Sequence, residues 1–177
     1  MIKEKLSMKP QSLLVIFLTI LSSILLFACN DTTSNNLEIT SPLKKAAITY
    51  FENEPKFITA DKLYENLNDG NEDNNPYIIS LRSAEDYAKG HIPGAVNIST
   101  KELFTLDTLK HLPTDKLIVV YCYTGQVGSQ VAAILNMLGY NAKSLLHGMS
   151  AWTDDPNIFH KRFDPKKHAH EYLTISE

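Results

Sequence analysis

The sequence predicts an α/β fold in which helices cover both faces of a parallel β-sheet. From about residue 48 onward, short apolar runs of strand length alternate with segments whose apolar residues recur at helical spacing. Such alternation favours parallel strands, because each connecting helix returns the chain to the same edge of the sheet. The composition, with 44% hydrophobic and 21% charged residues, is ordinary for a globular protein. A folded region of roughly 110 residues is enough for one such core.

The first three elements are defined by turn-forming and capping residues. Residues 56–69 predict a short strand that leads into a helix, with Thr59 or Asp61 as its N-cap. Residues 75–82 predict a buried strand that follows turn-forming residues. Residues 83–90 predict a short helix that begins after a serine and ends before a glycine.

The middle of the domain predicts two strands on either side of a helix. Residues 95–99 predict a short strand. Residues 100–113 predict one helix that stops at a proline, because four apolar residues recur at helical spacing: Leu103, Phe104, Leu106 and Leu109. Residues 116–122 are the most apolar strand, as expected for a strand with both faces covered.

The last part of the domain predicts a helix, a strand and a final helical turn. The helix covers residues 128–140 and begins near Gly128 or Ser129. Its expected buried stripe consists of Val131, Ile134, Leu135 and Leu138. Residues 142–148 predict the last strand, and residues 149–152 begin the last helical turn.

The N-terminus has the layout of a secretory signal. Three lysines precede residues 13–28, a stretch of 16 residues without charge. This stretch is short for a membrane-spanning helix, which needs about 20 residues. Residues 26–29, Leu-Phe-Ala-Cys, resemble a bacterial lipobox, so we expect cleavage before Cys29 and a lipid on its sulfur. The alternative is an uncleaved membrane anchor, and in either case the flanking lysines place the rest of the chain outside the cytoplasm.

These features divide the chain into four parts. Residues 1–28 are the expected lipoprotein-type signal peptide, and the polar residues 29–47 are the expected flexible tether. Residues 48–157 are the expected folded domain, and residues 158–177 a C-terminal extension. The expected location is extracytoplasmic, with the domain held at the bacterial cell membrane by the lipid on Cys29.

Composition excludes several classes of function. The formal charge of -3, without a basic patch that holds interleaved aromatic residues, gives no reason to expect a nucleic-acid partner. Only two cysteines, Cys29 and Cys122, are present, which excludes a disulfide framework and an all-cysteine metal site. The histidines of the C-terminal extension lack a metal-ligand pattern, so no metal site is expected.

Cys122 is the candidate nucleophile because of its position in the predicted sheet. Ligands of open parallel sheets bind beyond the carboxyl ends of the strands, and Cys122 ends the most buried strand. The loop after it contains Gly125 and Gly128 and leads into a helix, whose first N–H groups favour an anionic sulfur. The alternative is that Cys122 is a small apolar residue buried at the end of a strand, without reactivity.

Two segments in the expected order resemble the rhodanese-like sulfurtransferases. The first is "IISLRSAEDYAKGHIPGAVNIS", which resembles their strand, short helix and Gly-His-Ile-Pro-Gly-Ala segment. The second is "CYTGQVGSQVAAILNMLGY" followed by "LLHGMSAW", which resembles their active loop, the helix after it and the terminal strand. The resemblance covers about residues 57–152. It implies a rhodanese-like five-stranded parallel sheet with helices on both faces.

The resemblance also implies a function and a set of site residues. Cys122 would accept a sulfane sulfur from thiosulfate, a polysulfide or a persulfide, and pass it to a thiol or to cyanide. No cofactor is implied. Arg82 would support the turn after its strand, by pairing with Glu85 or Asp86, and His91 would support the segment that enters the next strand. The sulfur would be held by the backbone amides of Tyr123, Thr124, Gly125, Gln126, Val127 and Gly128.

The sequence departs from the family pattern at the loop. Many members have Arg or Lys there, whereas this loop reads Tyr-Thr-Gly-Gln-Val, so binding of the thiosulfate dianion would rest on backbone dipoles. Ser80 stands where members often have Asp, and His147 replaces a common glycine. A phosphatase of this fold is disfavoured because Gly128 occupies the position of its arginine. The stronger alternative is a non-catalytic rhodanese-like binding module tethered at the membrane surface.

Overall fold

The computed structural model describes residues 41–52, 56–159, 165–168 and 172–176. These residues belong to one compact unit, Ile39–Glu177. The predicted signal peptide and Cys29 lie outside the described residues. Within the described ranges, no helix has both the length and the apolar character needed to cross a membrane.

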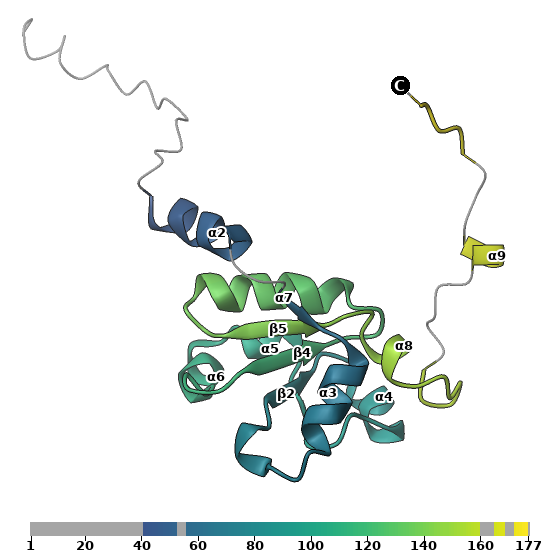
Figure 1. Ribbon diagram of the computed structural model, residues 1–177, viewed down its shortest axis with the longest axis horizontal. Helices are drawn as coiled ribbons and strands as arrows, with labels where there is room; N and C mark the ends of the chain where they lie inside the picture. The colour runs from purple at the N-terminus through teal and green to yellow at the C-terminus, as the bar shows by residue number, and fades with distance from the viewer. Residues whose placement is uncertain (1–40, 53–55, 160–164, 169–171, 177) are drawn as a thin grey trace, which may run out of the picture. The chain divides into compact units, whose positions relative to one another are not determined.

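The sheet has five parallel strands, which confirms the expected five-stranded parallel sheet (Figure 1). Their order, which the sequence analysis did not predict, is β1-β5-β4-β2-β3. The strands are β1 (Phe57–Ile58), β2 (Tyr77–Ser80), β3 (Val96–Asn97), β4 (Ile118–Tyr121) and β5 (Ala142–Leu145). The central strand is β4, whose four residues are all fully buried. Val120 of β4 is in register with Ile79 of β2 and with Ser144 of β5. The expected burial of this strand on both faces is therefore confirmed.

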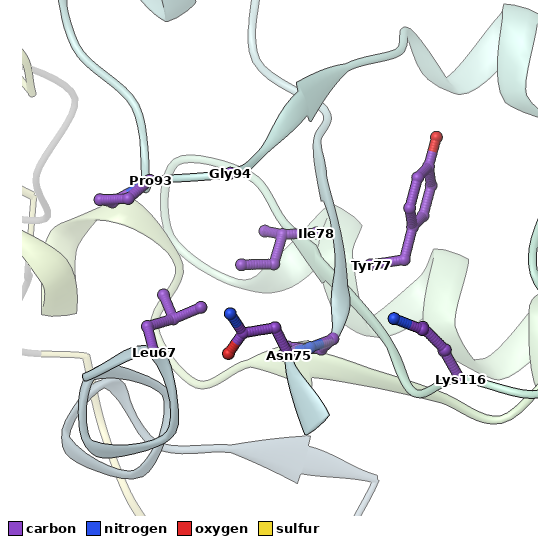
Figure 2. A pocket seen from close by; sticks show the side chains of 8 residues that line it. Leu67, Asn75, Tyr77, Ile78, Pro93, Gly94 and Lys116 are labelled. Carbon is purple, nitrogen blue, oxygen red and sulfur yellow. The ribbon is translucent and has the colours of Figure 1, made fainter. Parts of the chain in front are cut away.

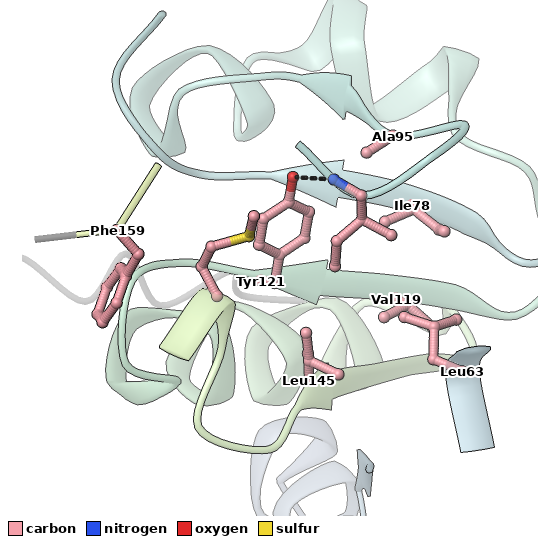
Figure 3. Close-up of a cluster of buried hydrophobic side chains, with 9 residues drawn as sticks. Leu63, Ile78, Ala95, Val119, Tyr121, Leu145 and Phe159 are labelled. Atoms are coloured by element: carbon pink, nitrogen blue, oxygen red, sulfur yellow. Dashed lines mark hydrogen bonds between the residues drawn. The ribbon is translucent and has the colours of Figure 1, made fainter. Parts of the chain in front are cut away.

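One face of the sheet is covered by three helices. They are α3 (Ala60–Leu67), α4 (Ala84–Lys89) and α8 (Met149–Trp152). Val119 and Tyr121 point from β4 into this layer, where the Tyr121 hydroxyl accepts a hydrogen bond from the Ile92 amide at 3.3 Å (Figure 3). Burial raises the pKa of Tyr121. The N-caps are Thr59 for α3 and Ser83 for α4, each with its side chain bonded to a backbone amide of the first turn.

The other face of the sheet packs against α5 (Thr100–Leu103), α6 (Leu106–His111) and α7 (Gln126–Met137). Ile118 and Val120 point into this layer, because successive side chains of a strand face opposite sides of the sheet. Figure 1 shows α7 along one side of the sheet, with α3 and α4 on the other. The prediction of helices on both faces is thus confirmed.

The single helix predicted for residues 100–113 is wrong, because the chain forms α5 and α6 there instead. Thr105 separates the two helices, and its side chain accepts a hydrogen bond from the Thr108 amide, which starts a second helix. Leu106, expected on the buried stripe, is 77% exposed. A capping side chain therefore overrides the apolar periodicity in this segment.

Helix α7 also differs from its prediction. It begins at Gln126, with Gly125 as N-cap, rather than near Gly128 or Ser129. Its buried residues are Gly128, Val131, Ala132 and Leu135. Ile134 and Leu138 are 44% and 53% exposed, so the buried stripe lies closer to the small residues than the sequence indicated.

Three short elements lie at the margins of the fold. Helix α2 (Pro42–Glu52) begins inside the segment expected as a tether, so regular structure starts before residue 48. A 3₁₀ turn, η1 (Glu72–Asn74), lies in the acidic loop before β2. Helix α9 (Pro165–His168) lies in the C-terminal extension.

Candidate active site: the loop after strand β4

Cys122 directly follows β4, at the carboxyl edge of the sheet. It is a free cysteine and only 5% exposed. Its backbone carbonyl accepts a hydrogen bond from the Met149 amide at 2.9 Å, and the Tyr123 carbonyl accepts one from the Ser150 amide at 3.0 Å. The start of α8 therefore holds the backbone on which the thiol stands.

Residues 123–128, which follow Cys122, are called the cysteine loop below. Two glycines allow this loop to pack closely against the turn before α8. Gly125 has φ of +89° and Gly148 has φ of +58°, values that favour glycine. A Cβ atom at Gly148 would lie 2.5 Å from the Cys122 carbonyl oxygen and 2.8 Å from the Gly125 nitrogen. A side chain at Gly148 would therefore displace the loop.

The cysteine loop leaves a row of backbone donors without a partner. The amides of Thr124, Gly125, Gln126, Val127 and Gly128 donate no hydrogen bond to any described residue. The last three belong to the first turn of α7, whose N–H groups have no intrahelical acceptor. Together with the left-handed backbone at Gly125, these amides form the kind of concavity that binds anions.

Ser129 fixes the first turn of α7, a role that the sequence prediction missed. Both its amide and its hydroxyl donate to the Gly125 carbonyl, each at 2.9 Å. Its hydroxyl oxygen also lies 3.3 Å from that of Ser144 on β5. The only signal in the sequence was a serine close to the expected helix start. Ser129 thus ties the cysteine loop to the neighbouring strand.

The Tyr123 side chain bonds to α4 at the edge of the site. Its hydroxyl donates to the Asp86 carboxylate and accepts a hydrogen bond from the Ser83 amide at 3.3 Å. This bond from Tyr123 holds the pKa of Asp86 well below its usual range, and hydrogen bonds from Lys89 and Ser83 act in the same direction. No sequence pattern indicates the bond between Tyr123 and Asp86, since the two residues are 37 positions apart.

Arg82 supports the same turn, but its partners differ from the prediction. Its guanidinium, 2% exposed, donates to the carbonyl oxygens of Gly90 at 2.7 Å, Asp86 at 2.8 Å and Ile158 at 2.6 Å. The expected ion pair with Glu85 or Asp86 is absent among the described contacts. Lys89 binds those carboxylates instead, at 2.8 and 3.3 Å, because it lies one helical turn from both.

Several other residues that the sequence analysis singled out are exposed. His91 is exposed and stacks on Tyr87, with ring centroids 3.9 Å apart, and its Nδ1 lies 3.0 Å from the Tyr87 carbonyl oxygen. No described contact joins it to the cysteine loop. Gln126 and Val127 are exposed at the start of α7. His147 is exposed, with a left-handed backbone at φ of 61°.

Two cavities of the described residues lie away from Cys122. One, of about 350 Å³, lies at the amino ends of β2 and β4, and Asn75, Tyr77 and Lys116 are among its lining residues (Figure 2). The other, of about 320 Å³, lies between α2 and α7. In the described ranges, no group of three or more His, Cys, Asp or Glu residues is placed to hold a metal ion.

Comparison with known proteins identifies the domain type. The family model described as "Rhodanese-like domain" matches residues 59–155, more than half of the chain. The matched region contains the cysteine loop, Arg82 and His91. A rhodanese-like domain protein from Staphylococcus aureus has a TM-score of 0.50 and 28% identity, over 56% of this chain and 93% of that one.

Two curated relatives are named as sulfurtransferases. A tRNA sulfurtransferase from Pyrobaculum aerophilum is 41% identical over 68 residues, which are 38% of this chain and 14% of that protein. An adenylyltransferase and sulfurtransferase from Ogataea parapolymorpha is 32% identical over 86 residues, 47% of this chain and 22% of that protein. The chain therefore spans less than a quarter of the length of either relative.

Proposed function

Because this chain belongs to the rhodanese-like domain family, we propose that it is a sulfurtransferase that carries a sulfane sulfur as a persulfide on Cys122. The single observation that carries the proposal is the setting of this cysteine. It stands at the carboxyl edge of the sheet, and unpaired amides at the start of α7 follow it. These amides would stabilise negative charge on the transferred sulfur without having to reorganise.

The proposed reaction has two displacement steps. The Cys122 thiolate attacks the outer sulfur of the donor, and the sulfur–sulfur bond of the donor breaks. The leaving group, sulfite from thiosulfate or a shortened polysulfide, departs with the electron pair. An acceptor, a thiolate or cyanide, then attacks the outer sulfur of the persulfide and regenerates the Cys122 thiolate. No external oxidant or reductant is needed in either step.

We further propose that polysulfides or small persulfides are better donors than thiosulfate. The segment from Cys122 to Gly128 contains no cationic side chain, so a dianion would be held by backbone dipoles alone. The nearest buried cation, Arg82, already donates to three carbonyl groups. A small persulfide carries a single charge, and a long polysulfide distributes its charge over the two ends of a sulfur chain, so either loses less hydration on entering such a site.

Intact mass spectrometry of the full chain tests the proposal. The protein is incubated with thiosulfate and, separately, with polysulfide, and thiocyanate is measured after cyanide is added. We expect a species one sulfur atom heavier, discharged by cyanide and absent in Cys122→Ser. A folded protein with a titratable thiol and no sulfur adduct from either donor would contradict the mechanism.

The second candidate is a non-catalytic binding module. One observation favours it: Cys122 is only 5% exposed. On this alternative the loop amides bind an anionic group of a partner, and the thiol stays unmodified. The same mass measurement separates the two functions, since only a sulfurtransferase acquires and releases sulfur.

We also propose that the domain acts outside the cytoplasm, held at the membrane by a lipid on Cys29. The basis is the charge pattern and the apolar stretch of residues 13–28. Cys29→Ala is expected to remove the lipid mass and to release or mislocalise the protein. Wild-type protein without lipid mass, together with unchanged membrane association of the variant, would indicate an uncleaved anchor instead.

A further inference from the structure

Helix α2 has apolar residues on two opposite faces. One face lines the cavity shared with α7, through residues that include Ala46 and Tyr50. The rest of the helix carries large apolar side chains toward solvent: Phe51 is 81% exposed, Leu43 65% and Ile48 42%. A helix that only covered a core would have a polar outer face.

The position of α2 in the chain indicates what this outer face meets. Thirteen residues, 29–41, separate the apolar stretch 13–28 from the start of the helix. Even when fully extended, a segment of that length spans only roughly 45 Å. If the apolar stretch or a lipid on Cys29 is in a bilayer, α2 is held close to the bilayer surface at high effective concentration.

The charge of α2 agrees with an anionic lipid surface. The helix contains Lys44 and Lys45 and a single acidic residue, Glu52, whereas the whole chain has a formal charge of -3. Lysines that flank exposed apolar residues are typical of helices that lie in the membrane interface. Anionic headgroups attract such lysines within about a Debye length of the surface.

We propose that α2 lies on the bilayer surface, with Leu43, Ile48 and Phe51 among the lipid headgroups. Lys44, which lies four positions before Ile48 and therefore on the same face, then meets anionic lipid, whereas Lys45 lines the cavity between α2 and α7. This surface goes beyond the proposed sulfur transfer and rests on the proposed membrane tether. Its effect would be to fix the orientation of the folded domain relative to the membrane instead of leaving it on a free linker.

Fluorescence quenching by labelled lipid tests this contact in the full chain. Phe51→Trp is made in a Trp152→Phe background, so that its indole is the only one, and reconstituted in vesicles that contain doxyl-labelled lipid. Leu106→Trp in the same background is the matched control, because Leu106 is also a large exposed residue, 77% exposed on α6. Circular dichroism verifies that each variant is folded.

We expect quenching of the Phe51→Trp variant to be about twofold stronger or more than that of the control, as for a side chain at the acyl boundary. It should be stronger in vesicles of phosphatidylcholine with phosphatidylglycerol than in phosphatidylcholine alone, and weaker when Lys44→Glu is added. Equal quenching of the two indoles would overturn the proposal.

The proposal that α2 lies on the bilayer would also be overturned if neither labelled lipid nor aqueous iodide quenched the Phe51→Trp indole. In that case protein, either a second copy of the chain or the N-terminal segment, would cover this face of α2. Sulfur loading of Cys122 is measured on the same samples. Failure to load would contradict the sulfurtransferase and leave the quenching result unaffected, so the two proposals fail separately.

Discussion

Two neighbouring strand ends at the carboxyl edge of the sheet use their polar groups in opposite ways. Strands β2 and β4 are paired side by side, with Ser80 opposite Tyr121. After β2, the charged Arg82 and Asp86 are buried and bonded to protein partners. After β4, the loop has no charged side chain, and the amides of residues 124–128 have no described acceptor. The turn after β2 therefore supports the fold, whereas the loop after β4 has donors available for the ligand that we propose.

The largest expected effect comes from closing the space beside the cysteine loop with Gly148→Ala. The new Cβ would lie 2.5 Å from the Cys122 carbonyl oxygen at a residue with φ of +58°. We expect a loss of roughly 2–4 kcal/mol in the free energy of unfolding, measured by denaturant titration, and loss of sulfur loading in the folded protein.

Gly139→Ala is the matched control for that substitution. Gly139 also has a positive φ, +95°, but a Cβ there meets nothing within 4 Å. Gly139→Ala should lower the free energy of unfolding by only about 1–2 kcal/mol, the cost of the left-handed backbone without a steric clash, and leave sulfur loading intact. Equal losses of stability in the two variants would contradict the close packing between the loop and the turn before α8.

Arg82→Met tests the supporting side of the comparison. The substitution keeps an unbranched apolar stem but removes the donors to three carbonyl groups that are buried or partly buried. We expect a loss of about 2–4 kcal/mol in the free energy of unfolding. Sulfur loading per folded molecule should stay near the wild-type value, because Arg82 does not belong to the loop. If the variant were fully stable but could not be loaded with sulfur, Arg82 would take part in the reaction and would not be only a supporting residue.

Adding a cation beside the cysteine loop tests whether the absence of charge there determines which sulfur donor is preferred. Gln126→Arg adds charge at the exposed first residue of α7, and Gln130→Arg adds the same charge one turn further along. We expect the first variant to raise the rate with thiosulfate relative to polysulfide by about tenfold, and the second by much less. An equal effect of both variants would indicate general attraction of anions, without a site at the loop.

Much of this arrangement could be predicted from the sequence, because local signals determine it. The alternation of apolar runs with helical patterns indicated the sheet, and the capping residues Thr59 and Ser83 indicated where two helices begin. The glycines after Cys122 indicated a loop of unpaired amides. The break at Thr105 was missed because two local signals conflict there. The apolar spacing favours one continuous helix, whereas the capping threonine starts a new one.

Long-range bonds explain the other misses. Arg82 was expected to pair with nearby carboxylates, yet it reaches the Ile158 carbonyl, 76 positions away. Tyr123 and Asp86 meet only because β2 and β4 are neighbours in the sheet. Sequence spacing does not show such contacts, since they depend on the order of strands.

The smallest expected effect concerns the bond that joins the two strand ends. Tyr123→Phe removes the hydroxyl that donates to Asp86 and that chiefly holds the pKa of this carboxyl down. A lowered pKa in the folded state adds stability above the pKa of the unfolded state, about 4, and that stability is lost as the pH falls toward the folded value. We therefore expect wild type to exceed the variant in free energy of unfolding at pH 6–7, and the gap to narrow below about pH 4.

Tyr140→Phe separates this electrostatic effect from the general loss of a hydroxyl. The Tyr140 hydroxyl donates to the Leu109 carbonyl, which does not titrate, so that variant should differ from wild type by the same amount at every pH in the range. Parallel pH profiles for both tyrosine variants would mean that the Tyr123 bond does not depend on the charge of Asp86. A gap that narrows only for Tyr123→Phe would show that the supporting turn holds the cysteine loop through an ionised carboxylate.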